Sequence, residues 1–415
     1  MNKTVCIKLL SGASAIALLS QVFASQSAIA INQSQEHTFE SFADWCEHKE
    51  QLAPAPKYTV EVLLNQVGTQ DCYEADDTLT VASRITFSFD ENVESLAPIA
   101  SLSNLEGLSI GGDSVVDLSP IAGLVNLKFL YLRVDPAADL SPIADLTNLE
   151  ELYLGINQLT DISPLASLTK LKQLDISNNK IADLSPLANL TALESLNLIN
   201  NCITTIEPLA ELTNLHTLFV AHNDIQDIAP LAELTNLRDL DISRTGISDL
   251  SPLSNLTHLE VLFGTDNNVT DIAALSNLNN LFMLGLSNGI DGYPIRGNNA
   301  ISDISPLANM TQLETLYLAD NRVVDASPLA NLTKLKELDL EYNLIAQAAP
   351  LSKLTNLESL YLTCNPIADV DELSGFLFAH VDYYNLPADA DEAERCREES
   401  IQRRQPPEEI RERLS

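Results

Sequence analysis

The chain has 415 residues, of which 45% are hydrophobic, and a formal net charge of −35. This charge excludes nucleic acid and anionic membrane surfaces as natural partners, because both are negatively charged themselves. The six histidines belong to no known catalytic motif, and the sequence has no phosphate-binding loop and no paired-cysteine zinc spacing. We therefore expect no enzyme activity, no cofactor and no metal.

Residues 1–30 have the pattern of a secretory signal peptide. Two lysines precede an apolar stretch over residues 9–24, and Ala28 and Ala30 form a small-residue cleavage pattern. We expect cleavage after Ala30, with Ala24 as the alternative. The apolar stretch is short and rich in serine for a membrane span, and no second apolar span follows, so the mature chain is expected to be secreted or periplasmic.

Residues 31–84 are predicted to form an N-terminal helical cap. Phe39, Phe42 and Trp45 recur every three residues, as on one face of an amphipathic helix. A second helix is expected over residues 58–67, which follow two prolines. Such a cap would shield the first unit of the region that follows.

The cysteines divide into two expected pairs and a remainder. Cys46 and Cys72 both lie in the small cap, where an exported protein favours a disulfide over a metal pair. Cys364 and Cys396 are a further candidate disulfide that would hold the C-terminal segment in place. Cys202 is left over and is expected to be a free thiol.

A proline recurs every 22 residues through the middle of the chain, and a fixed period of this length indicates a solenoid of stacked coils. In the unit at residues 171–192, apolar residues first alternate as in a strand, and Ser185-Pro186 then opens the second half. We expect the serine at the N-cap and the proline at the first helical position. Each coil is thus a short strand, a turn and a short α or 3-10 segment. The column consists of Pro98, Pro120, Pro142, Pro164, Pro186, Pro208, Pro230, Pro252, Pro306, Pro328 and Pro350, with Ala274 in one slot.

An asparagine follows the strand in nine coils, where its amide can tie the turning backbone of its own coil to the next one. Asp113, Asp135 and Thr245 replace it in three others. The nine are Asn157, Asn179, Asn201, Asn223, Asn267, Asn299, Asn321, Asn343 and Asn365.

Ten aspartates lie just before the Ser-Pro step, where a carboxylate can accept hydrogen bonds from backbone amides of the turn. We prefer this interpretation to a Ca²⁺ ladder, because one aspartate per coil offers too few oxygen ligands. The ten are Asp117, Asp139, Asp161, Asp183, Asp227, Asp249, Asp271, Asp303, Asp325 and Asp369.

The pattern L-x-x-L-x-L-x-x-N-x-I-x-D-[I/L]-S-P-L-A-x-L-T-N recurs in register over residues 85–375, in about 13 coils. It resembles the leucine-rich repeats of bacterial internalins and related secreted bacterial proteins. The resemblance implies an α/β repeat fold: a curved right-handed solenoid with a parallel sheet on the concave side and short helical or 3-10 segments on the convex side. It also implies protein recognition as the usual role, with the ligand set by variable concave positions. The cysteine-containing cap is similar to those of secreted repeat proteins in cyanobacteria.

The outward position in the middle of each strand is aromatic in six of twelve coils, although only 5% of the chain is aromatic. Aromatic rings on a rigid sheet are typical of binding interfaces. The alternative is that they reflect strand propensity and packing between strands. The candidate ligand-binding residues are Tyr131, Tyr153, Asp175, Asn197, Phe219, Asp241, Phe263, Tyr317, Asp339 and Tyr361. Ser109 and Gly285 occupy the remaining two positions.

Neighbouring positions are expected to make the concave face aromatic and acidic. They carry Glu151, Asp239, Asp266, Asp320, Glu337 and Glu341 against Arg133 and Arg244.

A ten-residue insertion at 289–298 interrupts the repeat just before Asn299. Insertions in solenoids form loops, often on the binding side, so Tyr293 and Arg296 are candidate contacts. A tolerated loop without a role is an equally good interpretation. Residues 376–415 are expected to form a C-terminal cap and a charged tail.

Together these features predict a secreted, non-catalytic recognition protein that binds a protein partner through the concave face. The partner's contact surface is expected to be neutral or basic. One alternative is carbohydrate or cell-wall binding by the same aromatic face. A passive structural or matrix component is another.

Overall fold

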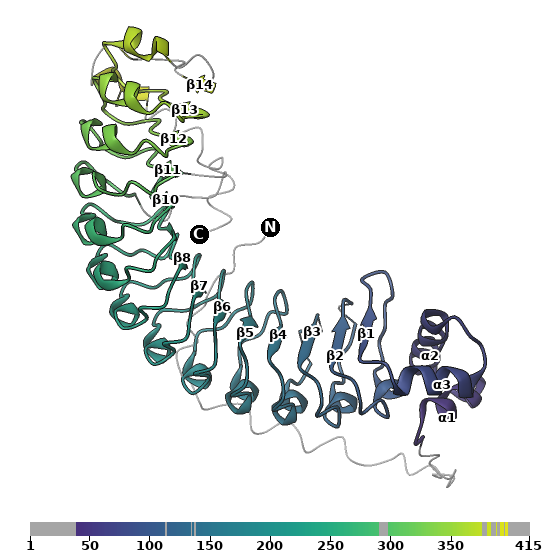
Figure 1. Ribbon diagram of the computed structural model, residues 1–415. Helices are drawn as coiled ribbons and strands as arrows, with labels where there is room; N and C mark the ends of the chain where they lie inside the picture. Colours follow the sequence, from purple (N-terminus) through teal and green to yellow (C-terminus); the bar gives the residue numbers. More distant parts are fainter. Residues whose placement is uncertain are drawn as a thin grey trace, which may run out of the picture.

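The computed structural model describes residues 39–112, 114–133, 135–136, 138–289, 298–375, 380–382, 387, 391–393 and 395–396. Fourteen parallel strands form one sheet, in which every strand pairs only with its neighbours in chain order. The chain curves into an arc with the strands on the inner side and the 3-10 segments on the outer side (Figure 1). The predicted leucine-rich-repeat solenoid with a concave parallel sheet is therefore confirmed.

Each strand is only three or four residues long. The strands are β1 (Arg84–Phe87), β2 (Gly107–Ile110), β3 (Phe129–Leu132), β4 (Glu151–Tyr153), β5 (Gln173–Asp175), β6 (Ser195–Asn197), β7 (Thr217–Phe219), β8 (Asp239–Asp241), β9 (Val261–Phe263), β10 (Met283–Gly285), β11 (Thr315–Tyr317), β12 (Glu337–Asp339), β13 (Ser359–Tyr361) and β14 (His380–Asp382). The outer segments run from η2 (Ala97–Ile99) to η14 (Val370–Gly375), and those described are all 3-10 rather than α-helical.

Three helices precede the sheet: α1 (Phe42–Glu47), α2 (Pro54–Val67) and α3 (Cys72–Thr80). The first two match the expected helices, although Phe39 lies before α1 and stacks on Trp45 with ring centroids 4.0 Å apart. The third was not predicted. Asp71 is its N-cap, and its carboxylate accepts from the backbone N–H groups of Tyr73 and Glu74. Buried residues of these helices join the same core as the coils, so the helices cover the open end of the solenoid.

The asparagine column forms a hydrogen-bonded ladder that connects each coil to the one before it. Asn343 Nδ2 donates to the carbonyl oxygens of Leu340 in its own coil at 3.0 Å and of Leu318 in the preceding coil at 2.9 Å. Its Oδ1 accepts from Val323 N, also in the preceding coil, at 2.9 Å. The side-chain amide thus bonds to the preceding coil and not to the next one. It pairs buried backbone N–H and C=O groups that would otherwise have no hydrogen-bond partner.

The aspartate column caps the 3-10 segments. In nine of the ten cases the carboxylate accepts from the backbone N–H two residues later, as from Ser185 to Asp183 at 2.8 Å. The expectation that serine is the N-cap is wrong. Ser185 is the first residue of its segment, and the preceding Leu184 makes no side-chain cap hydrogen bond. The carboxylate two residues before the serine takes that role because it reaches the first free amide.

The structure joins Cys46 to Cys72 and Cys364 to Cys396, with Cα–Cα separations of 5.5 and 5.8 Å. The first bond links α1 to α3, and the second ties the C-terminal segment to the coil of β13. The expectation of a free thiol at Cys202 is wrong, because Cys202 is disulfide-bonded.

Candidate binding surface on the concave sheet

The predicted contact residues form one continuous row across the sheet. Strand pairing places Tyr131 opposite Tyr153, Asn197 opposite Phe219, and Tyr317 opposite Asp339. We call this the central row; from β2 to β13 it consists of Ser109, Tyr131, Tyr153, Asp175, Asn197, Phe219, Asp241, Phe263, Gly285, Tyr317, Asp339 and Tyr361. Because side chains alternate between faces of a strand, these residues point away from the buried leucines on either side.

The aromatic rings of the central row occupy outward positions but are half-buried and not fully exposed. Their neighbours in the adjacent coils cover part of each ring. Phe263 shows why: its ring lies over Gly285 on the next strand, where an added Cβ would be 2.5 Å from Phe263 Cδ1. The Phe263 ring therefore lies along the sheet, over the neighbouring strand.

The polar members of the central row have a structural task of their own. Oδ1 of Asp175, Asp241 and Asp339 accepts from the backbone N–H two residues later at 2.8, 2.9 and 3.0 Å. Asn197 does the same for Ile199 at 3.1 Å and also donates to Asp175 Oδ2 at 3.1 Å. These four side chains stabilise the turn of the backbone that follows their strands. The aromatic members of the row carry the stronger case for contact with a ligand.

Two tyrosines of the row have perturbed hydroxyl groups. Burial, with hydrogen bonding to Glu337, raises the pKa of Tyr317 to about 12. Burial and the nearby Glu151 also raise the pKa of Tyr153, whose hydroxyl donates to Gln173 Oε1 at 2.9 Å. Both hydroxyls are thus neutral at physiological pH and held in place by side chains of the same face.

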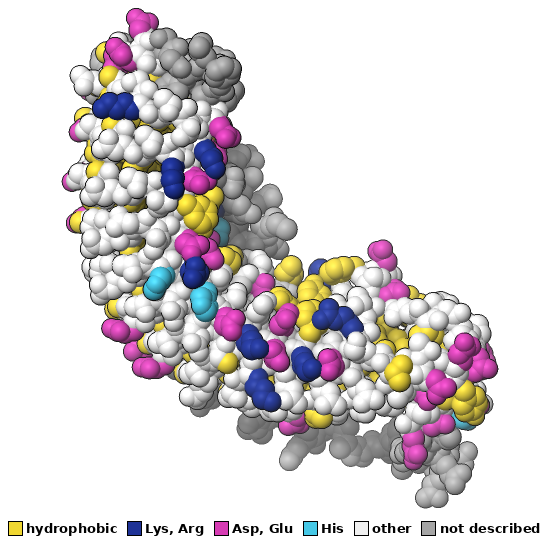
Figure 2. All heavy atoms as spheres, viewed as in Figure 1, with side chains coloured by type: hydrophobic (Ala, Val, Ile, Leu, Met, Phe, Trp, Pro, Cys, Tyr) yellow, Lys and Arg dark blue, Asp and Glu magenta, His cyan; other side chains and the backbone are white. Residues whose placement is uncertain are grey.

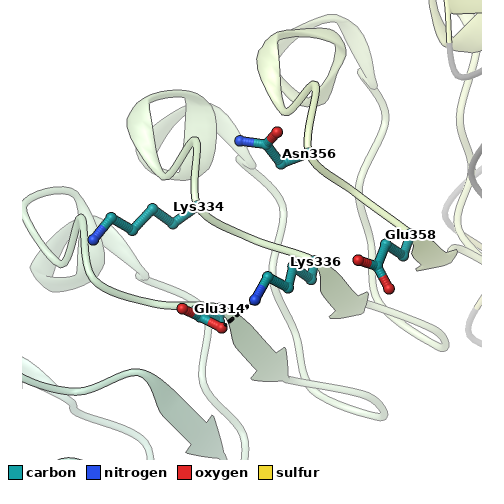
Figure 3. A pocket seen from close by; sticks show the side chains of 5 residues that line it. All are labelled: Glu314, Lys334, Lys336, Asn356 and Glu358. Atoms are coloured by element: carbon teal, nitrogen blue, oxygen red, sulfur yellow. Dashed lines mark hydrogen bonds and ion pairs between the residues drawn. The ribbon is translucent and has the colours of Figure 1, made fainter.

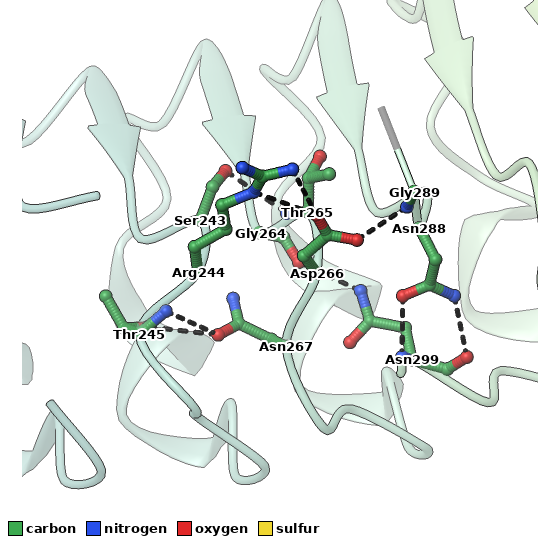
Figure 4. A network of polar contacts seen from close by, with 10 residues as sticks. All are labelled: Ser243, Arg244, Thr245, Gly264, Thr265, Asp266, Asn267, Asn288, Gly289 and Asn299. Atoms are coloured by element: carbon green, nitrogen blue, oxygen red, sulfur yellow. Dashed lines mark hydrogen bonds and ion pairs between the residues drawn. The ribbon is translucent and has the colours of Figure 1, made fainter. Parts of the chain in front are cut away.

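The acidic flanks of the row are weaker than the sequence suggested. Asp266 and Asp320 are 0% and 1% exposed, and Arg244 is 6% exposed. Arg244 Nη2 lies 2.7 Å from Asp266 Oδ2, so these two charges form a buried ion pair (Figure 4). They support the fold beside the insertion and offer no charge to a partner.

The ends of the insertion are fastened to the coil. Gly289 N donates to Asp266 Oδ1 at 2.6 Å, and Asn288 exchanges two hydrogen bonds with the backbone of Asn299, at 2.7 and 2.9 Å (Figure 4). Asn299 still takes the ladder position, accepting from Val269 N at 2.9 Å. The candidate contacts Tyr293 and Arg296 lie outside the described residues.

An aromatic cluster at the N-terminal end of the concave face was missed by sequence reasoning. Phe129 packs against Tyr153 with ring centroids 5.6 Å apart, and the Arg84 guanidinium lies 4.4 Å from the Phe129 centroid. Beside them, Phe89 meets Tyr131 edge-on at 6.4 Å, with the Arg133 guanidinium 5.8 Å from the Phe89 ring. We call these six residues the N-terminal aromatic cluster. Figure 2 shows hydrophobic side chains along the concave rim over the first strands.

The signal for this cluster was present in the sequence. Phe129 occupies the outward strand position two residues before the central row, in register with Arg84 through Gly107. A single repeat column does not reveal the cluster, because the cluster combines both outward columns with Phe89 from the loop after β1.

A row of alternating charge runs along the side where the strands begin. Ion pairs join Lys128 to Glu106 at 2.9 Å, and Lys172 to Glu150 and Lys336 to Glu314 at 2.6 Å each. A shallow polar pocket in this row is lined by Glu314, Lys334, Lys336, Asn356 and Glu358 (Figure 3). Lys336 pairs with Glu314, and the charged side chains are largely exposed, so the pocket has the character of a solvated surface.

Two further observations concern the described part of the chain. No helix there is long and apolar enough to cross a membrane. Nor do three or more histidine, cysteine, aspartate or glutamate side chains in those residues come together in a way that could hold a metal ion.

Known proteins share both the repeat and the architecture. The family described as Leucine Rich repeats (2 copies) matches residues 147–277 and 295–375 in overlapping pairs of coils. An internalin (inlF) from Listeria monocytogenes is 33% identical with a TM-score of 0.73, over 81% of this chain and 97% of that one. The chain therefore belongs to the leucine-rich repeat family. Within it, the chain is an internalin-like bacterial protein.

More distant structures share the fold alone. A leucine-rich repeat protein from Leptospira interrogans is 18% identical with a TM-score of 0.61, over 83% of this chain and 99% of that one. The ectodomain of a plant membrane receptor kinase from Arabidopsis thaliana, in complex with Casparian strip integrity factor 2, is 18% identical. Its TM-score is 0.54, over 75% of this chain and 45% of that one. No curated protein shows a significant sequence match.

Proposed function

We propose that this chain is a secreted, non-catalytic recognition protein that binds a protein partner through its concave face. The observation that carries the proposal is the central row, in which six half-buried aromatic rings occupy one register line of a 14-stranded sheet. Aromatic side chains contribute large contact area and have few rotatable bonds to freeze on binding. A rigid sheet holds them in position before the partner arrives.

The charge of the molecule favours a partner with a neutral or basic contact surface. The net charge is −35, and Glu151, Asp239, Glu337 and Glu341 are half-buried beside the central row. Like charges facing one another across an interface disfavour association. Most of this face therefore disfavours the binding of a strongly acidic partner.

Two features of the chain, its N-terminal composition and its disulfides, favour export from the cytoplasm. The first 30 residues have the composition of a signal peptide, and disulfides such as Cys46–Cys72 and Cys364–Cys396 persist in oxidising compartments. Both support a location outside the cytoplasm, in the periplasm or the medium.

A second candidate function is glycan or cell-wall binding by the same face. Tyr131 and Tyr153 are followed along the row by Asp175 and Asn197, an arrangement of stacking rings and polar groups that suits sugars. Asp175 and Asn197, however, already bond to the backbone and to each other. This leaves fewer free polar groups for sugar hydroxyls, so we favour the protein partner.

The test is a pull-down from the envelope fraction of the parent organism with mature protein. Wild type should retain a specific protein, whereas the double variant Tyr131→Ser/Tyr153→Ser should lose it. Retention of peptidoglycan or polysaccharide, with the same loss in the double variant, would favour the glycan function. Retention of neither would leave the passive structural role as the better account.

A further inference from the structure

Exposed apolar side chains lie near the N-terminal end of the concave face. Phe89, in the loop after β1, is 61% exposed, and Ile156, three residues after Tyr153, is 57% exposed. Phe129, Tyr131 and Tyr153 of the N-terminal aromatic cluster are half-buried. Exposed apolar side chains gathered on one face are typical of an interaction site.

Ile156 is a further apolar residue at this end. It has φ 67°, in the left-handed region that β-branched residues avoid. The equivalent positions of later coils share this conformation whatever residue they carry, as Asn178, His222, Arg244 and Tyr342 do, so the left-handed backbone belongs to the repeat. What sets Ile156 apart is its exposed β-branched side chain, which adds apolar surface at this end.

Arg84 is held in a defined position by its neighbours. It crosses β2 at Gly107, where an added Cβ would lie 2.7 Å from Arg84 Nε, and its guanidinium covers the Phe129 ring on β3 at 4.4 Å. A guanidinium stacked in this way keeps its N–H edge open, because its donors lie in the plane of the group.

Arg84 also lacks a carboxylate partner within the described residues. Some cations there do have one, since Arg244 pairs with Asp266, Arg238 with Glu260, and Lys172 with Glu150. Others bond only to neutral amide oxygens, as Lys170 does to Asn148 and Lys334 to Gln312. Arg84 is thus an exposed cation that lies over an aromatic ring, in a chain whose net charge is −35. A planar guanidinium with its edge open matches the geometry of a carboxylate.

We propose that the N-terminal aromatic cluster anchors one carboxylate side chain of the partner, next to an apolar side chain of the same protein segment. Arg84 receives the carboxylate, and Phe89 and Tyr131 receive the apolar neighbour. The inference rests on the proposed function and names the part of the concave face that recognises the partner. A single carboxylate in an otherwise neutral or basic segment agrees with the acidic charge elsewhere on the face.

The experiment uses a displayed library of random twelve-residue peptides, selected on the immobilised full-length mature chain. Wild type should enrich peptides with Asp or Glu beside an aromatic or aliphatic residue. A synthetic peptide from the enriched set should bind Arg84→Gln at least about tenfold more weakly, because a charge-assisted hydrogen-bonded pair is lost. Arg84→Lys should recover only part of the affinity, since lysine lacks the planar pair of donors.

Two further variants separate a binding role from a structural one. Arg84→Glu should shift the selected peptides from acidic to Lys- or Arg-containing ones, a change of specificity that loss of folding cannot produce. Gly107→Ala removes no charge but displaces Arg84 from Phe129, so it should also weaken the enriched peptide. Arg238→Gln is the matched control: it removes an exposed arginine whose partner Glu260 lies in the charged row outside the cluster, and it should bind like wild type.

Several outcomes would overturn the inference. These are enrichment of peptides without acidic residues, unchanged binding by Arg84→Gln, or no enrichment over a blank surface. Binding of acidic polysaccharide in place of any peptide would overturn it too. Enrichment that depends on Tyr317 and Tyr361 but not on Arg84 would reject the carboxylate site while leaving concave-face binding intact. The two proposals can therefore fail separately.

Discussion

The carboxylate of Asp369 accepts a hydrogen bond from the backbone N–H of Ala348, which lies in the preceding coil, at 2.6 Å. Its other oxygen accepts from Ala349 N at 3.0 Å. Other members of the aspartate column cap their own coil, but the coil of Ala348 has Gln347 in the aspartate position. Asp369 thus supplies from the next coil the cap that Gln347 does not provide.

This relationship predicts an effect on stability and its rescue. Asp369→Ala should lower the free energy of unfolding by about 0.5–2 kcal/mol, the usual cost of a lost helix cap. Adding Gln347→Asp to that variant should restore most of the loss by capping the segment from within its own coil. Urea unfolding followed by circular dichroism measures both. Glu211→Ala, which removes an exposed carboxylate, is the control; an equal loss there, or no rescue by Gln347→Asp, would contradict the capping role.

The asparagine ladder predicts a larger effect from a buried amide than from an exposed one. Asn179 is 2% exposed, and its side chain bonds to backbone groups of its own and the preceding coil. Asn179→Ala should cost about 1–3 kcal/mol by leaving those groups unpaired, whereas Gln173→Ala, at an exposed site, should cost far less. Equal melting temperatures for the two variants would show that the ladder assignment is wrong.

The aspartate caps predict a stability loss in acid. The Ser185 backbone N–H and hydroxyl hold the pKa of Asp183 below its ordinary value of 3.8. A lowered folded-state pKa contributes stability that is present above the unfolded value and lost as the pH falls through the folded value. Unfolding free energy should therefore drop below about pH 4, and a carboxyl NMR titration should show Asp183 protonating at a higher pH in Ser185→Ala. An unchanged titration in that variant would show that the serine hydroxyl does not lower the pKa of Asp183.

Tyr317 predicts a change at the alkaline end. Its pKa is raised from 10.0 to about 12, mainly by burial and next by Glu337. The folded state therefore favours the neutral form of the hydroxyl over the phenolate. That stability is complete below pH 10 and is lost as the pH rises toward 12. Ultraviolet absorbance of phenolate should show one fewer late-titrating tyrosine in Tyr317→Phe. Loss of a tyrosine that titrates near pH 10 would argue against burial of this hydroxyl.

Much of the fold was predictable because its signals are periodic. The proline and asparagine columns place the strands from β1 to β13, and side-chain alternation puts Tyr131 and Tyr153 on the concave face. The last strand, β14, lies in the segment 376–415 that was expected to be the C-terminal cap and tail. The third cap helix was missed because residues 72–80 have only two buried positions, Ala75 and Leu79, and so little apolar pattern. Serine was assigned the capping role because one repeat cannot show which residue reaches the free amide.

The candidate site was only partly predictable. A column of residues shows which side chains share a row, but not that a glycine such as Gly107 lets Arg84 cross to Phe129. Burial of Asp266 and Arg244 was equally hidden, because their shared repeat position is exposed at Ile156 but buried at Asp320. These features depend on contacts between coils, which the repeat pattern does not encode.

The concave-face account is tested most directly by affinity measurements on an identified partner. Tyr131→Ser/Tyr153→Ser and Tyr317→Ser/Tyr361→Ser should each weaken binding by about 30-fold or more, since a hot-spot side chain contributes about 2 kcal/mol or more. Circular dichroism and melting should stay near wild type. The control Lys170→Ala/Lys334→Ala changes exposed residues outside the central row and should bind normally. If both tyrosine pairs change affinity only a few-fold, or if the lysine control does more damage, the partner does not bind the concave face.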